Sequence, residues 1–217
     1  MDAETGRAPA VDAPAGRPSA VRLGAGAVGC LVALVVMLLL VRQNTAPIWE
    51  LEVVDAATHF PVVVGGPLVA VMQLGRRALV PAVALVVWAL TRQPRACIVV
   101  VAAGLVAGFG VDLLKEWSER PRPADADAGT RVREAADGFG FPSGHTAIAF
   151  ALAAVVTAYV PERWRWAPFA VAGAVGVARL YVGAHYPLDV VGGAMWGLAV
   201  GWTAVLLTTR RVDRTPG

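Results

Sequence analysis

Residues 23–41 read LGAGAVGCLVALVVMLLLV, an apolar run that lies between Arg22 and Arg42. An α-helix of about 19 residues spans roughly 30 Å, the thickness of the hydrocarbon core of a bilayer. A secretory signal peptide is the competing interpretation, because a charged region precedes the run. The apolar part of a signal peptide is only about 7–15 residues long, and no small-x-small cleavage site follows here. We therefore interpret residues 23–41 as a first transmembrane helix.

The composition of the whole chain is also typical of a membrane protein. Of the 217 residues, 57% are hydrophobic and 16% are charged, whereas a soluble domain has about 25% charged residues. The net charge of +3 comes from basic residues spread over short connections, so it does not predict a nucleic-acid partner. Cys30 and Cys97 each lie inside an apolar run, which predicts neither a disulfide framework nor a zinc site.

The apolar runs predict an all-α polytopic membrane protein with six transmembrane helices. Five further spans are expected at about 78–91, 96–114, 144–160, 166–182 and 188–208. Residues 43–75 mix apolar, acidic and turn-forming residues, which predicts an amphipathic or re-entrant segment after the first span. We expect a disordered cytoplasmic tail at residues 1–20, a six-span domain at 21–209 and a cytoplasmic tail at 210–217.

Basic residues in short connections indicate the orientation of the spans. With six spans, the side that holds both termini carries ten basic residues and the other side carries nine. If Lys115, Arg122 and Arg179 are assigned to a binding site, the comparison becomes ten against six. The shortest turns, 92–95 and 161–165, are basic and lie on the terminal side. The positive-inside rule then predicts a multi-pass cell-membrane protein with cytoplasmic termini and an extracytoplasmic site.

Three polar segments interrupt the apolar chain, namely KEWSERPRP at 115–123, FPSGH at 141–145 and ARLYVGAHYPLD at 178–189. Charged residues at membrane depth are costly and usually functional. Lys115, the only lysine, offers a compact charge, whereas Arg122 and Arg179 offer planar groups that match phosphate oxygens in pairs. Three such cations stabilise the charge of a phosphoryl group, which is the task of a metal ion elsewhere. We predict a phosphate site with no metal and no cofactor.

The remaining residues of these segments would complete the site. Ser143 has the type and position of a helix N-cap, so free backbone N–H groups at Gly144 and His145 would face an anion. His185 and Asp189 are four residues apart, and Pro187 suits the first turn of a helix. If that helix begins by residue 185 or 186, Asp189 can hold one imidazole nitrogen and leave the other free for attack.

These segments resemble the three signature motifs of the type 2 phosphatidic acid phosphatase superfamily, which contains membrane lipid phosphate phosphatases. The matching patterns are Lys115-x6-Arg122-Pro123, Pro142-Ser143-Gly144-His145 and Arg179-x5-His185-x3-Asp189. The third motif usually begins Ser-Arg, and here Ala178 stands in place of the serine. The resemblance implies a metal-independent hydrolase in which His185 attacks phosphorus and Asp189 orients it. His145 would protonate the leaving oxygen and then activate water.

The resemblance also bears on the substrate. A small six-span protein with an outward site resembles bacterial enzymes that recycle the cell-wall lipid carrier, so polyprenyl diphosphate (undecaprenyl or decaprenyl) is the leading choice. Phosphatidic acid or phosphatidylglycerol phosphate is the alternative, and a lipid-linked sugar phosphate is a third. An alternative of another class is a non-catalytic transporter or scaffold that keeps a phosphate site. The expected partners are the lipid substrate and the bilayer.

Several polar residues outside the motifs have simpler interpretations. His59 is expected to be structural, and Arg120, Arg131 and Arg133 are expected to be solvated loop charges. Asp112 lies one helical turn before Lys115, so it is expected to pair with Lys115 or with another nearby cation.

Overall fold

The computed structural model describes residues 19–42, 46–126, 130–134 and 136–212, and within these ranges every regular element is helical. The α-helices are α1 (Ala20–Val41), α2 (Ile48–Thr58), α3 (Val62–Met72), α4 (Val80–Thr91), α5 (Pro94–Ser118), α6 (Pro123–Ala126), α7 (Gly144–Val156), α8 (Ala167–Tyr181) and α9 (Pro187–Val212). Short 3₁₀ turns are η1 (Gln73–Gly75), η2 (Arg77–Leu79), η3 (Thr157–Tyr159) and η4 (Glu162–Trp164). The predicted all-α class is confirmed. The tail predicted at residues 1–20 lies almost wholly outside the described ranges.

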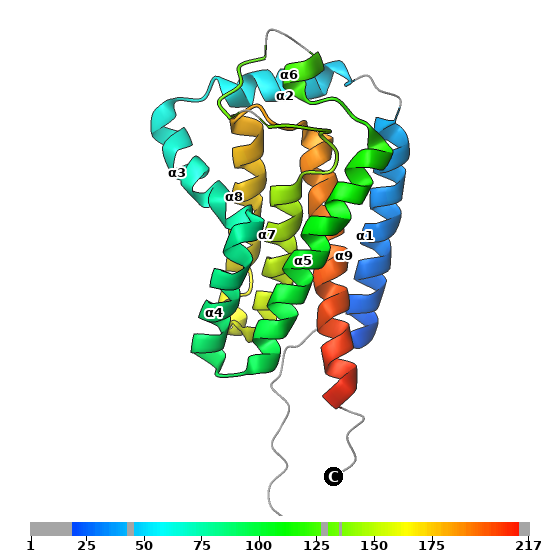
Figure 1. Ribbon diagram of the computed structural model, residues 1–217, viewed down its shortest axis with the longest axis vertical. Coiled ribbons are helices and arrows are strands. Elements are labelled where there is room, and N and C mark those ends of the chain that lie inside the picture. The colour runs from blue at the N-terminus through cyan, green and yellow to red at the C-terminus, as the bar shows by residue number, and fades with distance from the viewer. Residues whose placement is uncertain (1–18, 43–45, 127–129, 135, 213–217) are drawn as a thin grey trace, which may run out of the picture.

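Helix α7 forms the centre of the bundle. It packs against α5, α8 and α9, while α1 covers α9 and α4 covers α5 (Figure 1). The close approach of α7 and α9 depends on glycine, because a Cβ atom added at Gly197 would lie 2.2 Å from the carbonyl oxygen of Ala147. Small residues at such crossings are the usual device by which helices associate in membranes.

Three helices are long and apolar enough to cross a membrane by themselves, namely α1, α5 and α9. The pair Gly65–Gly75 and Arg77–Thr91 passes the same test as one span bent by 70°. Helix α7 is apolar but shorter. The chain is therefore a membrane protein with three to four candidate spans in its described part, and the count of six remains a prediction. The bend lies between Gly75 and Arg77, at the end of the segment 43–75, and the amphipathic or re-entrant character of that segment stays a prediction.

The polar elements gather at one end of the bundle. Helix α2 and the short α6 lie across this end together with the connections after α5 and α8, whereas α1 begins and α9 ends at the opposite end (Figure 1). Helix α2 contacts both α8 and α9. This capped end brings together residues that are far apart in the sequence.

Candidate active site

The three polar segments meet around one cavity of about 320 Å³ at the capped end, which we call the polar cavity. Six of the eight predicted site residues line it, namely Lys115, Arg122, Gly144, His145, Arg179 and His185. Ser143 and Asp189 lie behind its wall and are fully buried. The cavity is also lined by five residues that the motifs do not include, namely Gly75, Arg76, Arg77, Asp112 and Glu134.

His185 and Asp189 lie together as the spacing predicted. The Nδ1 atom of His185 is 3.4 Å from Oδ2 of Asp189, and the same oxygen accepts the backbone N–H of Tyr186 at 2.9 Å. Helix α9 begins at Pro187, slightly later than the start at 185 or 186 on which the prediction rested. The contact survives because Asp189 bonds back to the residue that precedes the helix, as in half of a capping box.

The second ring nitrogen of His185 faces the cations of the cavity. Its Nε2 atom lies 3.4 Å from Nη1 of Arg122. Burial, and then the positive charges of Arg179, Arg122 and Lys115, hold the pKa of His185 well below its ordinary value. The imidazole is therefore neutral near pH 7, which is the form that can act as a nucleophile.

Arg122 has a structural task as well as a place in the cavity wall. It donates to the carbonyl oxygens of Ala184 at 2.8 Å, Gly138 at 2.7 Å and Asp137 at 3.0 Å. These bonds tie the connection after α6 to the turn that carries His185. Removal of Arg122 would therefore disturb the position of the histidine as well as the charge of the cavity.

Three nitrogen atoms of residues that line the cavity are buried and lack a hydrogen-bond partner among the described residues, namely Nε2 of His145, Nε of Arg179 and Nδ1 of His185. Arg179 is 2% exposed, and its Nη1 atom reaches Oε1 of Glu134 at 3.5 Å and the sulfur of Met72 at 3.2 Å. Buried polar atoms are nearly always paired in folded proteins. Nδ1 of His185 faces Asp189 at 3.4 Å, so the other two atoms, on His145 and Arg179, indicate where a polar ligand would bind.

Ser143 occupies the N-cap position of α7, but its side chain makes no capping bond. Its hydroxyl accepts a bond from Thr146 at 3.1 Å, and its backbone N–H donates to the carbonyl oxygen of Asp189 at 2.8 Å. The first turn of α7 is thereby fixed to the first turn of α9. Ala178 is also fully buried, among apolar side chains of α3 and α8.

The predictions for the other charged residues had mixed outcomes. Asp112 pairs with Arg77 at 2.5 Å, in agreement with the second of its two expected partners. The solvated role of Arg120 is wrong, since this side chain is 3% exposed and contacts both Glu50 and Asp189. Arg133 is also partly buried, and it donates to the carbonyl oxygen of Thr58 at 2.8 Å. Sequence reasoning missed Glu50 and Glu134.

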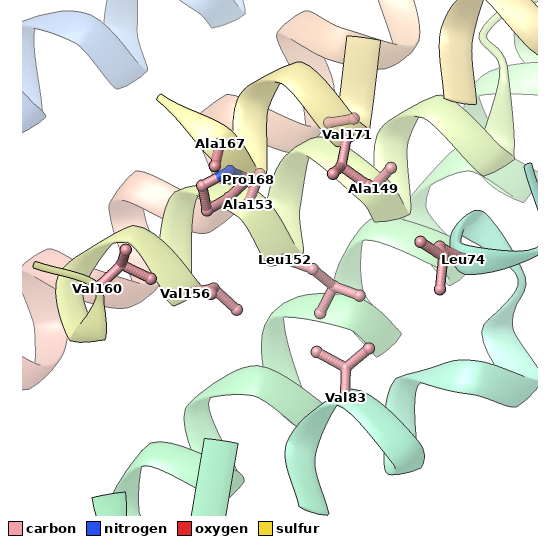
Figure 2. A pocket seen from close by; sticks show the side chains of 11 residues that line it. Leu74, Val83, Ala149, Leu152, Ala153, Val156, Val160, Ala167, Pro168 and Val171 are labelled. Carbon is pink, nitrogen blue, oxygen red and sulfur yellow. The ribbon is translucent and has the colours of Figure 1, made fainter. Parts of the chain in front are cut away.

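An apolar groove of about 330 Å³ is lined by Leu74 and Ala149 among others, and these two residues directly neighbour Gly75 and Ile148 of the polar cavity in the sequence. Leu74, next to Gly75 of the polar cavity, stands at one end, and the groove continues between α4, α7 and α8 past Leu152 and Val171 to Val160 (Figure 2). Together the two spaces suit an amphiphile with an anionic head and an apolar tail. The described residues contain no group of three or more His, Cys, Asp or Glu side chains placed to hold a metal ion.

Residues 95–213 match the model of the PAP2 superfamily, more than half of the chain. The chain belongs to the PAP2 superfamily. This confirms the resemblance of the three motifs, all of which lie within the matched residues. The matched residues of this PAP2 protein do not include Glu50, Arg76 or Arg77.

Curated relatives of this PAP2 protein share parts of the chain. It is 34% identical to phosphatidylglycerophosphatase B of Bacillus subtilis over 105 residues, covering 42% of this chain and 49% of the relative. It is 40% identical to the bacitracin transport permease protein BcrC of Bacillus licheniformis over 73 residues (31% and 35%). It is 42% identical to lipid A 4′-phosphatase of Bacteroides thetaiotaomicron over 85 residues (36% and 37%). The chain thus matches half or less of each relative.

Two solved structures share the fold. A PAP2-type phosphatidylglycerolphosphate phosphatase of Bacillus subtilis superposes with a TM-score of 0.74 at 19% identity, covering 88% of this chain and 99% of that one. LpxE of Aquifex aeolicus superposes with a TM-score of 0.65 at 24% identity, covering 71% and 93%.

Proposed function

We propose that this protein is a membrane lipid phosphatase that works through a phosphohistidine at His185, with polyprenyl diphosphate as its preferred substrate. The observation that carries the proposal is a cationic cavity with His185 in its wall, whose Nδ1 atom lies 3.4 Å from the buried carboxylate of Asp189, together with an apolar groove whose lining residues neighbour those of the cavity in the sequence. Cations and helix N–H groups bind a phosphate, and the groove accepts a lipid tail.

The proposed reaction has two steps. The anionic phosphate brings negative charge beside His145, which takes up a proton. The Nε2 atom of His185 then forms a bond to phosphorus, and the bond from phosphorus to the leaving oxygen breaks while His145 gives that oxygen its proton. In the second step His145 takes a proton from water, the water oxygen bonds to phosphorus, and the bond to Nε2 breaks. Lys115, Arg122 and Arg179 stabilise the charge on the remaining phosphoryl oxygens in both transition states.

Arg76 favours a diphosphate over a monophosphate. Its side chain is 52% exposed at the cavity wall, and its ion pair with Glu134 is long, at 3.8 Å. Arg77, in contrast, is held by Asp112 and by the carbonyl oxygen of Gly108 at 2.6 Å. Arg76 is thus an additional cation, outside the motifs, that can turn toward a second phosphate. Phosphatidic acid or phosphatidylglycerol phosphate is the alternative substrate.

Purified protein tests the proposal directly. Phosphate release is measured with EDTA present from polyprenyl diphosphate, polyprenyl monophosphate, phosphatidic acid and phosphatidylglycerol phosphate. We expect the highest kcat/KM with the diphosphate and no turnover in His185→Ala. Full activity in that variant would refute the nucleophile, and binding of lipid phosphates without any turnover would favour a transporter or scaffold.

The proposed orientation has cytoplasmic termini and an extracytoplasmic site. The polar cavity lies at the end of the bundle opposite the start of α1, which is consistent with a site and termini on opposite sides. The basic turns at 92–95 and 161–165 support a cytoplasmic terminal side. A tag at residue 217 that is accessible only from outside the cell would contradict it.

A further inference from the structure

We propose that Glu50 of α2 is a positioning residue of this site, which fixes Asp189, and through it His185, by way of Arg120 and the N-terminus of α9. This inference rests on the proposed role of His185. It assigns a task to a residue that lies before the matched region 95–213.

A continuous line of buried charges connects Glu50 with the site. Nη1 of Arg120 donates to Oδ1 of Asp189 at 2.6 Å, and Nη2 donates to Oε2 of Glu50. Arg120 is 3% exposed, and Glu50 and Asp189 are fully buried. Arg120 is held further by its guanidinium group over the ring of Tyr186, 4.7 Å from the ring centre. Water therefore does not screen these interactions, and their geometry is closely defined.

Glu50 also binds the helix that carries Asp189. Its second oxygen, Oε1, accepts the backbone N–H of Leu188 at 2.9 Å. The first N–H groups of a helix have no partner within the helix, and a negative charge there is favourable. Glu50 thus holds the first turn of α9 twice, once directly and once through Arg120.

These contacts hold the Asp189 carboxylate in one orientation. Arg120 donates to Oδ1, while Oδ2 accepts the N–H of Tyr186 and faces Nδ1 of His185. When His185 attacks phosphorus it acquires positive charge, and a carboxylate in a fixed position stabilises that charge. Without Glu50, Arg120 would lose one of its two carboxylate partners and could turn, releasing Asp189 with it.

A stabilising role alone accounts poorly for this arrangement. Buried ion pairs are often no more stable than apolar side chains of the same size, and the best-supported reason to keep one is to specify geometry. Here the geometry specified is that of the two residues with the proposed catalytic roles. The position of α2 across the end of the bundle would thereby be coupled to turnover.

The main test compares Glu50→Gln with Glu52→Gln. The control makes the same change on the same helix at an exposed residue. With the lipid phosphate that the wild type hydrolyses best, we expect Glu50→Gln to lower kcat by about tenfold to a hundredfold, a size known for residues that orient a functional side chain. KM should stay within about threefold, and Glu52→Gln should resemble the wild type. Unchanged kcat in Glu50→Gln would overturn the proposal.

A binding measurement separates this inference from the proposed function. Orthovanadate adopts the five-coordinate geometry of phosphoryl transfer, whereas inorganic phosphate does not. We expect Glu50→Gln to weaken vanadate binding by about tenfold or more and phosphate binding by less than about threefold. Equal vanadate affinity in the variant and the wild type would refute the role of Glu50. A wild type that hydrolyses no lipid phosphate would refute the proposed function and leave the vanadate comparison valid.

A second variant covers the case in which Glu50→Gln folds poorly. Glu50→Asp keeps a negative charge beside Arg120, and so avoids an unpaired buried cation. Its side chain is one methylene shorter and cannot reach both Arg120 and the N–H of Leu188 as Glu50 does. We expect a protein that unfolds near the wild-type temperature with kcat lowered by about threefold or more. A wild-type kcat in folded Glu50→Asp would contradict the positioning role.

Discussion

Arg76 provides a test of substrate choice, because it can be removed without disturbing the motifs. Its side chain is half exposed, and its ion pair with Glu134 is long. A charge-assisted hydrogen bond contributes about 1.5–3 kcal/mol when shielded, and an exposed ion pair about 0.2–1 kcal/mol. A half-exposed contact with a second phosphate should therefore contribute roughly 1 kcal/mol, which corresponds to about a fivefold change in kcat/KM.

The assay measures kcat/KM for polyprenyl diphosphate and polyprenyl monophosphate with the wild type and with Arg76→Ala. We expect a fall of about fivefold for the diphosphate and less than twofold for the monophosphate. Arg163→Ala removes the same charge from an exposed turn at the other end of the bundle and serves as the control. The difference should shrink at high salt, because solvent-exposed charges are screened. Equal losses with both substrates, or none, would refute the assignment of Arg76 to a second phosphate.

Three further predictions concern pH, packing and the groove. Because the pKa of His185 is depressed in the folded protein, folding stability should fall as pH drops below about 6.5, where the unfolded chain takes up the proton first. The thermal unfolding temperature should therefore fall as the pH is lowered, and it should fall less in His185→Gln. Gly197→Ala should destabilise the protein by roughly 1–3 kcal/mol through the clash with Ala147. Gly173→Ala, where an added Cβ meets nothing within 4 Å, should be neutral or slightly stabilising, and equal unfolding temperatures would contradict the packing argument. Val171→Trp should narrow the apolar groove and raise KM for a polyprenyl substrate, while a short-chain phosphate ester should be unaffected; equal effects on both would show that the tail lies elsewhere.

The residues with local sequence signals were predicted well. His185 and Asp189 lie close together because they stand four residues apart at the start of α9, and the bond from the Tyr186 N–H to Asp189 holds the turn between them. Lys115, Arg122 and Arg179 line one cavity because each lies at the end of an apolar run on the same side. Such features follow from helix geometry and from the cost of charge at membrane depth.

The residues that depend on distant partners were missed. Arg120 looked like a loop charge because Glu50 lies 70 positions and Asp189 lies 69 positions away. A weak signal existed for Glu50, since it shares a helical face with Val54 and Thr58, and all three are buried. That periodicity indicates which face of α2 is covered, but not which residues cover it.

The close approach of η1 to α7 has a consequence for the extent of the active unit. A Cβ atom at Gly75 would lie 2.5 Å from the carbonyl oxygen of His145, so this turn fits against the start of α7 almost backbone to backbone. Gly75, like Glu50 and Arg76, precedes the region 95–213 that carries every family motif. A segment cut at the family boundary would retain the reacting side chains and lose part of the wall that encloses them. Swaps between relatives should therefore exchange residues 46–212 as one block.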